Sequence, residues 1–545
     1  MKLLSLTITF LIALSSFSQE SGSSKASQNP KLVLGIVVDQ MRYDYLTRFE
    51  AKFDDGGFMR LINNGFNCKN HHFNYVPTKT GPGHASVFTG TSPSNHGIIS
   101  NNWYDKFSDK SVYCASDESV IAVGVNTSSE RMSPKRMKTT SVTDQLKLHT
   151  QGKSKVIGIS IKDRGAILPA GHSADAAYWF RGKNEGKFIT SSYYKNELPK
   201  WVKNFNKKIP TYLKIWKTLI PIDQYVESGA DDSNFEEPFK GQDKPIFPYD
   251  LKKLSSKNKG FDIIKRTPHG NEMLTNFAIA SIKNEALGKD EITDFLTLSY
   301  SSPDYVGHQF GVNSIEVEDT YLRLDKELSK LFNYLDKRVG VGEYTVFLTA
   351  DHGAVNVPNY LKSKGIPAGY FDNNDFETNV KDALLTKFAI KGLVKNISNN
   401  QIFLNKELIK TNKLNLIEIQ EYLASEIVLF KHIDKAFTSY ALSQSQFESG
   451  VGKLVQNGFH QKHSGDVVFV LEPAVISYPE KGSTHGSSFS YDTHVPLLFY
   501  GAGIINGETL QKTEVIDIAP TISSLLGISF PNGCTGKPLE KVLIK

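Results

Sequence analysis

Three apolar runs that each end in an aspartate place the strongest constraint on how this chain can fold. The runs read KLVLGIVVD up to Asp39, DFLTLSYSSPD up to Asp304 and YTVFLTAD up to Asp351. Such Val-, Ile-, Leu- and Phe-rich runs are typical of parallel strands buried on both faces. Two further runs, KVIGISIKDR and VPLLFYG, indicate additional strands. The chain therefore predicts a covered sheet with an acidic side chain where three of its strands end.

Helical segments between these runs complete an alternating pattern of strand and helix. The clearest covers residues 314–338, where Ser314 can cap the amino end and Glu316 and Glu318 suit the first turn. Its apolar positions fall on one face: Tyr321, Leu324, Leu328, Leu331, Phe332 and Leu335. We expect an α/β fold with a doubly wound, mostly parallel central sheet and helices on both faces.

Two segments differ in composition from the rest of the chain. Residues 181–290 and 356–480 are richer in Lys, Asn, Tyr and Pro and weaker in strand signal. Large α/β enzymes often grow by insertion into one sheet, so chain length alone does not require several domains. We expect one catalytic domain over residues 31–545, with these two segments inserted as caps.

The amino terminus has the pattern of a secretory signal peptide. A lysine is followed by an apolar run and by small residues at Ser16 and Ser18. The run is too short to cross a bilayer, and no cysteine stands at the expected cleavage point. We expect a signal peptide at residues 1–18, a polar linker at 19–30, and a periplasmic or extracellular mature chain without a stable membrane anchor. An uncleaved anchor is the alternative.

Charge and cysteine usage exclude other classes. The 63 basic and 57 acidic residues give a net charge of +6 without any basic block, which disfavours a nucleic-acid partner. The three cysteines, Cys68, Cys114 and Cys534, allow at most one disulfide. They are too few and too scattered for a cysteine metal cluster or a disulfide scaffold.

Histidines accompany the strand-end aspartates. Asp304 begins DYVGH, which places His308 four residues on and on the same face of a helix. Asp351 is followed directly by His352, and THGS supplies His485 far downstream. Because ligands of open α/β sheets bind beyond the carboxyl ends of the strands, we expect these side chains to converge on one crevice.

The number of donors indicates more than one metal ion. Three carboxylates and three imidazoles offer six donors, whereas a four-coordinate zinc ion uses four at most. We infer a two-metal site for which zinc fits best, with manganese or iron as alternatives and calcium disfavoured by the histidines. Two ions about 4 Å apart suit an in-line displacement at phosphorus.

The segment YVPTKTGPGHASVFTG contains the candidate nucleophile. A hydroxyl bound to a metal loses its proton readily and can attack phosphorus near neutral pH. Thr80 precedes Gly81, which leaves space for a phosphoryl group, and the helix that follows directs its positive end there. Thr78 follows Pro77 and is expected in the incoming strand or turn. We therefore choose Thr80.

Seven motifs resemble, in order, those of the alkaline phosphatase superfamily: GIVVDQMRYDY, YVPTKTGPGHASVFTG, GIISNNWYD, ISIKDRGAILPAGH, SPDYVGH, TADHGA and THGS. Within it the chain looks like a phosphate-irrepressible, PafA-type alkaline phosphatase over essentially the whole mature length. The resemblance implies a bi-zinc enzyme that hydrolyses phosphate monoesters through a covalent phosphothreonine. We expect it to act on small molecules and to be a monomer.

The resemblance also assigns ligands to the two ions. Four side chains would hold the zinc that activates the nucleophile: Asp39, Thr80, Asp351 and His352. Three would hold the zinc that stabilises the departing oxygen and supplies hydroxide to cleave the phosphoenzyme: Asp304, His308 and His485. Spacing alone could not divide the ligands between the ions.

Three further positions would contact the non-bridging phosphoryl oxygens by the same resemblance: Asn101, Lys162 and Arg164. A monoester brings about two negative charges, which suit the planar fork of an arginine and the compact charge of a lysine. A shift of one residue would exchange Asn101 for Asn102.

The chain departs from the family pattern at TKTGPGH, in Lys79 and in the pair Gly81-Pro82. Lys79 is left outside the predicted site. His84 and His96, though they lie within the motifs, are interpreted as structural.

Several rival functions are weighed on the same residues. A sulfatase would need an oxidisable Cys or Ser and an arginine in the frame that here reads Thr80, Pro82, His84. A binding protein that had lost the chemistry should show a broken ligand set, and a phosphoethanolamine transferase should show several apolar spans. A phosphodiesterase or nucleotide pyrophosphatase would share every ligand, and it stays open as the alternative.

Overall fold

The computed structural model describes residues 29–544 of the chain. The predicted signal peptide at 1–18 and nearly all of the linker at 19–30 lie outside the described residues. Within residues 29–544, no helix combines the length and the hydropathy that a membrane span requires. The three cysteines are all free.

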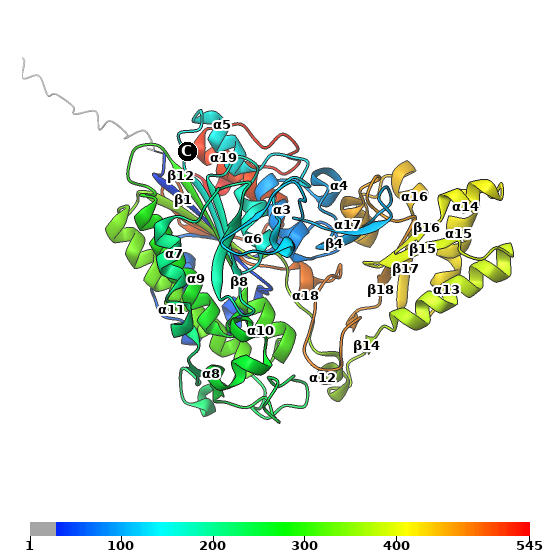
Figure 1. The fold of residues 1–545 in the computed structure, drawn as a ribbon, viewed down its shortest axis with the longest axis horizontal. Coiled ribbons are helices and arrows are strands. Elements are labelled where there is room, and N and C mark those ends of the chain that lie inside the picture. Colours follow the sequence, from blue (N-terminus) through cyan, green and yellow to red (C-terminus); the bar gives the residue numbers. More distant parts are fainter. Residues whose placement is uncertain (1–28, 545) are drawn as a thin grey trace, which may run out of the picture.

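A ten-stranded mixed sheet forms the centre of the molecule (Figure 1). Its middle strands run parallel to one another. In spatial order they are β13 (Tyr344–Thr349), β1 (Leu32–Val38), β12 (Asp294–Tyr300), β7 (Val156–Ser160) and β8 (Ala176–Arg181). Antiparallel pairs add β20 (Leu497–Gly501) beside β13 and β9 (Lys187–Ser191) beside β8. The predicted α/β fold class is confirmed, with antiparallel strands toward both edges.

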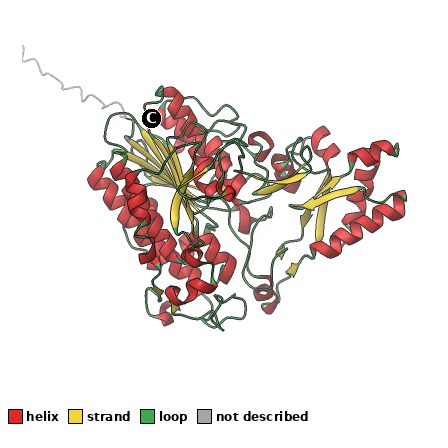
Figure 2. Cartoon of the chain, viewed as in Figure 1, coloured by secondary structure: helices red, strands yellow, loops and turns green. Residues whose placement is uncertain are grey.

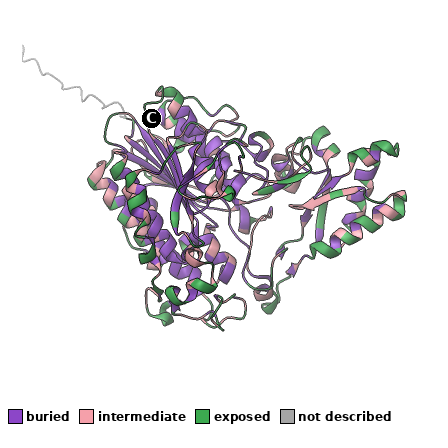
Figure 3. Cartoon of the chain, in the orientation of Figure 1, coloured by how far each residue is buried: buried purple, intermediate pink, exposed green. Residues whose placement is uncertain are grey.

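The middle strands are mostly apolar because helices cover both faces of the sheet (Figure 2). Every residue of β1, β12 and β13 is buried, and the sheet forms the buried centre of the molecule (Figure 3). Helices α9 (Pro268–Asn284) and α11 (Ile315–Arg338) lie on one side, and α3 (Thr80–Thr89) and α6 (Asp163–Ala170) on the other (Figure 1).

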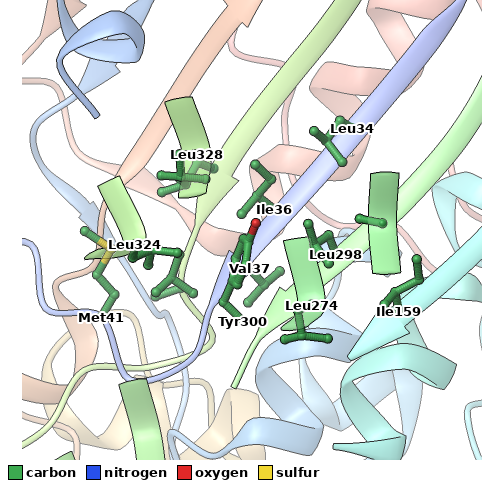
Figure 4. Packing of buried hydrophobic residues seen from close by; sticks show 14 of the residues in the cluster. Leu34, Ile36, Val37, Met41, Ile159, Leu274, Leu298, Tyr300, Leu324 and Leu328 are labelled. Atoms are coloured by element: carbon green, nitrogen blue, oxygen red, sulfur yellow. The ribbon is translucent and has the colours of Figure 1, made fainter. Parts of the chain in front are cut away.

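Helix α11 follows the pattern predicted for residues 314–338. The Ser314 hydroxyl accepts a hydrogen bond from Val317 N at 3.2 Å, so the helix begins at the predicted cap. The six predicted apolar positions are all buried. Leu324 and Leu328 belong to the same buried cluster as Val37 of β1 (Figure 4).

A second, smaller sheet stands apart from the central one (Figure 1, yellow and orange). We call residues 369–476 the side lobe. Its antiparallel strands are, in spatial order, β15 (Val394–Ser398), β16 (Gln401–Leu404), β18 (Val467–Leu471) and β17 (Ile433–Thr438). Helices α13 (Asn373–Phe388) and α15 (Leu416–Ile427) contribute to an apolar cluster of its own.

The two segments predicted as insertions differ in their relation to the central sheet. The side lobe lies within residues 356–480, and the chain leaves the central sheet after β13 and returns to it with β20. Within residues 181–290, β9 pairs with β8 in the central sheet. The boundaries of one domain with two inserted segments stay a prediction.

Candidate active site

The candidate active site lies at the carboxyl ends of the parallel strands. Asp39 follows β1 directly, and Asp351 follows β13 after one residue. Asp304 lies in the first turn of α10 (Ser302–Phe310), which begins just after β12. All three carboxylates are buried. The parallel order of β13, β1 and β12 therefore brings three aspartates that are far apart in sequence to one edge.

Histidines complete two groups of potential ligands. Asp39, Asp351 and His352 offer ligand atoms that all lie within 4.8 Å of one another, and so do Asp304, His352 and His485. His352 is common to both groups, and its ring stacks on that of His485 with centroids 3.4 Å apart. The predicted division, with His352 on one ion only, is not reproduced by these groups and stays a prediction.

His308 reaches the second group through Asp304. Its Nε2 lies 3.1 Å from Asp304 Oδ1, and the Nε2 of His485 lies 3.7 Å from the same oxygen. His308 and Asp304 lie one helical turn apart in α10, as their spacing predicts. The structure therefore brings all six predicted Asp and His donors to one region.

The histidines are oriented by backbone carbonyls. His308 Nδ1 lies 2.7 Å from Ser483 O, and His485 Nδ1 lies 2.7 Å from Thr78 O. An Nδ1–H that donates to a carbonyl leaves the lone pair on Nε2, which is how protein ligands to metals are commonly held. Burial lowers the pKa of His485 to about 3, so this imidazole is neutral at pH 7. Neutral imidazole is the form that binds metal.

Three buried atoms at the strand ends fit a cation. Asp39 Oδ1, Asp351 Oδ2 and His352 Nε2 have no hydrogen-bond partner among the described residues. The imidazole nitrogen lies 3.5 Å from each of the two oxygens. His352 Nδ1 lies 3.0 Å from Gly353 O and can donate its proton to that carbonyl. The other ring nitrogen, Nε2, is then an acceptor, and it faces the two carboxylate oxygens, which are acceptors too. Burial raises the pKa of Asp351 to about 7. A divalent ion of the zinc class matches this donor set.

Thr80 opens helix α3 at the edge of this group. Its Oγ1 lies 3.3 Å from Lys162 Nζ and 3.4 Å from Arg164 Nη2. The backbone N–H of Gly81 donates to Asn101 Oδ1 at 2.7 Å. The amino end of a helix favours anions, and here two cationic side chains and an amide also surround it. The space beside Thr80 Oγ1 is therefore suited to a phosphoryl group. Thr78 is directed elsewhere, because its hydroxyl donates to Ser487 O at 2.9 Å.

Lys162 also contacts the carboxylates. Its Nζ lies 2.7 Å from Asp39 Oδ2 and 2.5 Å from Asp304 Oδ2. Burial favours the neutral amine, but Asp304 and Asp39 outweigh it and raise the pKa of Lys162. The lysine is therefore charged at neutral pH and lies between the predicted ligands and Thr80.

Two positioning residues were missed by the sequence analysis. Gln40 donates from Nε2 to Asp304 Oδ1 at 2.9 Å and from its backbone N–H to Asp351 Oδ1 at 3.1 Å. Tyr113 accepts from Arg164 Nη1 at 3.1 Å and donates to Asp163. Only the place of Gln40 directly after the first aspartate in GIVVDQ signalled its role.

The two histidines interpreted as structural have partners in the core. His84 Nδ1 lies 2.9 Å from Thr80 O, and its Nε2 lies 2.9 Å from Ser299 Oγ. His96 Nε2 lies 2.9 Å from Ser86 Oγ. His84 Nδ1 also lies 3.3 Å from Asp351 Oδ2, and the structural role of both histidines stays a prediction.

The chain is similar to known proteins over most of its length. The family model described as type I phosphodiesterase/nucleotide pyrophosphatase matches residues 33–494. The chain is 45% identical over 526 residues to alkaline phosphatase PafA of Elizabethkingia meningoseptica, covering 95% of this chain and 96% of that protein. It is 42% identical over 517 residues to alkaline phosphatase PhoV of Synechococcus elongatus, covering 94% and 93%.

Two further matches span nearly the whole chain. A protein of Myroides odoratus that is named a calcium-transporting ATPase is 46% identical over 532 residues, covering 96% of each chain. The crystal structure of wild-type PafA matches with a TM-score of 0.91 and 44% identity, covering 95% of this chain and 99% of that one.

Proposed function

This chain belongs to the type I phosphodiesterase/nucleotide pyrophosphatase family of the alkaline phosphatase superfamily, and from that premise we propose a secreted bi-zinc phosphomonoesterase that works through a phosphothreonine. The chain is an alkaline phosphatase, as are relatives that match it over nearly their whole length. The metal, the covalent step and the secretion are the parts proposed here. Secretion rests on the signal-peptide pattern at residues 1–18.

The observation that carries the proposal is the group of buried acceptors beside Thr80. Asp39 Oδ1, Asp351 Oδ2 and His352 Nε2 face one another and form no hydrogen bond among the described residues, with His84 Nδ1 3.3 Å from Asp351 Oδ2. Asp39, Thr80, Asp351 and His352 would hold one zinc ion. Asp304, His308 and His485 would hold the other. Zinc bound there would ease deprotonation of the attacking hydroxyl and stabilise the departing oxygen.

The other side chains position and transfer the phosphoryl group. Thr80 Oγ1 gives its proton to solvent and bonds to phosphorus, while the bond from phosphorus to the alcohol oxygen breaks on the opposite side and that oxygen takes a proton from water. Asn101, Lys162 and Arg164 hold the non-bridging oxygens, since all three lie around the amino end of α3. Water then cleaves the phosphothreonine and releases inorganic phosphate, which restores the Thr80 hydroxyl.

The family model's description makes diester hydrolysis the natural rival, and rates on both substrate types test it. We expect purified enzyme to hydrolyse an aryl phosphate monoester at least about 100-fold faster, by kcat/KM, than the matching bis-aryl diester, because two cations suit a dianion. Metal analysis of the same sample should find two zinc ions per chain. Faster diester hydrolysis would establish the phosphodiesterase instead.

The two cations beside Thr80 should set this preference. We expect Lys162→Ala combined with Arg164→Ala to lower monoester kcat/KM by roughly 10²- to 10⁴-fold. The double variant removes two hydrogen bonds to charged groups, and each is worth about 1.5 to 3 kcal/mol. Diester turnover should fall far less, because a diester carries one negative charge fewer. Steady-state kinetics on both substrates measure the two losses.

Lys147→Ala provides the matched control, since Lys147 is half-buried and pairs with Asp175 at 3.0 Å beside the first residue of β7, at the opposite end of the strand from Lys162. It should change neither rate by more than a few fold. Equal losses on monoester and diester in the double variant would refute the role given to Lys162 and Arg164.

A further inference from the structure

A cavity of about 340 Å³ lies between the active site and the side lobe. Its active-site wall includes Lys79, Asn101, His308 and His485. Its opposite wall comes from the side lobe, where Asn399, Asn400, Gln401 and Ser464 border an apolar stretch: Val455, Phe459, Val468, Phe469, Val470 and Leu471. The volume lies in the range of small-molecule sites, which are mostly apolar with a few convergent polar groups.

We propose that this cavity is the subsite for the alcohol part of the substrate and selects phosphate monoesters of apolar alkyl or aryl alcohols. The inference rests on the proposed function, because His308 and His485 are expected on the side of the departing oxygen. Both line the cavity. A phosphoryl group held beside Thr80 would therefore place its alcohol against the side lobe.

Few charged side chains line the cavity, and none of the described ones belongs to the side lobe. Among the described residues that line it, and apart from histidines, Lys79 and Asp492 alone carry a formal charge. Lys79 Nζ donates to Asn399 Oδ1 at 2.8 Å, and Asp492 Oδ2 accepts from Ser487 N at 2.7 Å. A charged group placed against the side-lobe wall would lose hydration without a counter-charge there, whereas an apolar group would lose water-exposed surface.

Several contacts join the side lobe to the rest of the protein, among them those of Asn457 with Asn74 and of His463 with Gly97. The side chain of Asn399 adds contacts beside the active site. Asn399 begins the two-residue turn between β15 and β16 and adopts the left-handed conformation with φ 53°. Its Oδ1 accepts from Lys79 Nζ and Ser100 Oγ, each at 2.8 Å, and its Nδ2 donates to Asn102 O at 2.7 Å. These partners lie next to Thr80 and Asn101 in the chain. The apolar wall is thereby held at a set distance from the phosphoryl site, as substrate selection requires.

A series of n-alkyl phosphates from methyl to hexyl tests the proposal, because the leaving-group reactivity changes little along it. We expect kcat/KM to rise with chain length by about two- to fourfold per methylene until the cavity is filled. The inhibition constants of matching n-alkylphosphonates, which are not hydrolysed, should fall in parallel. This second readout reports binding in the cavity independently of chemistry.

Variants of Val468 locate the effect. Val468 is partly exposed and lines the cavity, so Val468→Asp should flatten the chain-length dependence while methyl phosphate turnover changes less than about threefold. Val468→Thr keeps the shape and should lower the slope if the aspartate variant does not fold. Leu429→Asp is the control, because Leu429 is 78% exposed on the side lobe and does not line the cavity.

The outcomes separate the two proposals. A flat chain-length dependence in an enzyme that turns over methyl phosphate would overturn the subsite and leave the phosphatase standing. The same holds if Val468→Asp and Val468→Thr both keep the wild-type slope. Failure to hydrolyse any monoester would instead overturn the proposed function.

Discussion

Thr80→Ala should keep its metal and lose most of its turnover. The hydroxyl is the proposed attacking atom, and removing the nucleophile of a covalent hydrolase costs on the order of 10³-fold or more in kcat. The folded structure should survive, because the protein contacts that Oγ1 loses are those with Lys162 and Arg164. Metal should stay bound, because Asp39, Asp351 and His352 still offer three ligands to the ion. Steady-state kinetics and metal analysis of one preparation measure both quantities. Mass spectrometry after an acid quench should find phosphate on wild-type Thr80 only.

Thr78→Ala serves as the matched control for this variant. Thr78 lies two residues away, but its hydroxyl donates to Ser487 O, so its loss should cost far less activity. If Thr78→Ala were the inactive variant and Thr80→Ala retained turnover, the nucleophile would be assigned wrongly.

Asp351→Ala should lose both metal and activity. Asp351 belongs to the group with Asp39 and His352, and removing a ligand weakens the site itself. Removing a residue that only hydrogen-bonds to a metal ligand commonly lowers metal affinity by about 10- to 100-fold. Because Asp351 is a proposed ligand itself, we expect its loss to lower zinc affinity by more than about 100-fold. Competition with a zinc chelator gives the affinity, and kinetics at fixed free zinc give the activity.

Asp294→Ala separates this effect from simple destabilisation. Asp294 is buried at the opposite end of the sheet, where it begins β12 and accepts from Lys155 N at 2.7 Å. It should lower thermal stability while leaving zinc binding in place. Equal zinc affinity in Asp351→Ala and the wild type would exclude Asp351 from the ligand set.

The sequence was sufficient to predict the features that depend on neighbouring residues in the chain. The runs that end at Asp39 and Asp351 carry the composition of covered parallel strands, and Ser314 carries the preference of a helix cap. The convergence of the aspartates followed from one topological rule, since parallel strands end at the same edge.

Other features depend on contacts that no local pattern encodes. The bond from Lys79 to Asn399 joins positions 320 residues apart, and no periodicity or composition links them. Gln40 connects two aspartates through a side chain and a backbone amide, which requires the geometry of three strand ends at once. Ring stacking of His352 on His485 likewise appears only in three dimensions.

The side lobe has an apolar cluster of its own, separate from the core of the central sheet. The lobe packs around its own buried residues, such as Phe376 and Leu423, and its contacts near Thr80 include the turn at Asn399 and the bond from Val76 N to Leu454 O. Substitutions on the cavity-facing side of β18 can therefore alter which alcohols are accepted without repacking the strands that present the aspartates. We therefore expect substitutions in the lobe to be a route by which selectivity for the alcohol can be evolved or engineered.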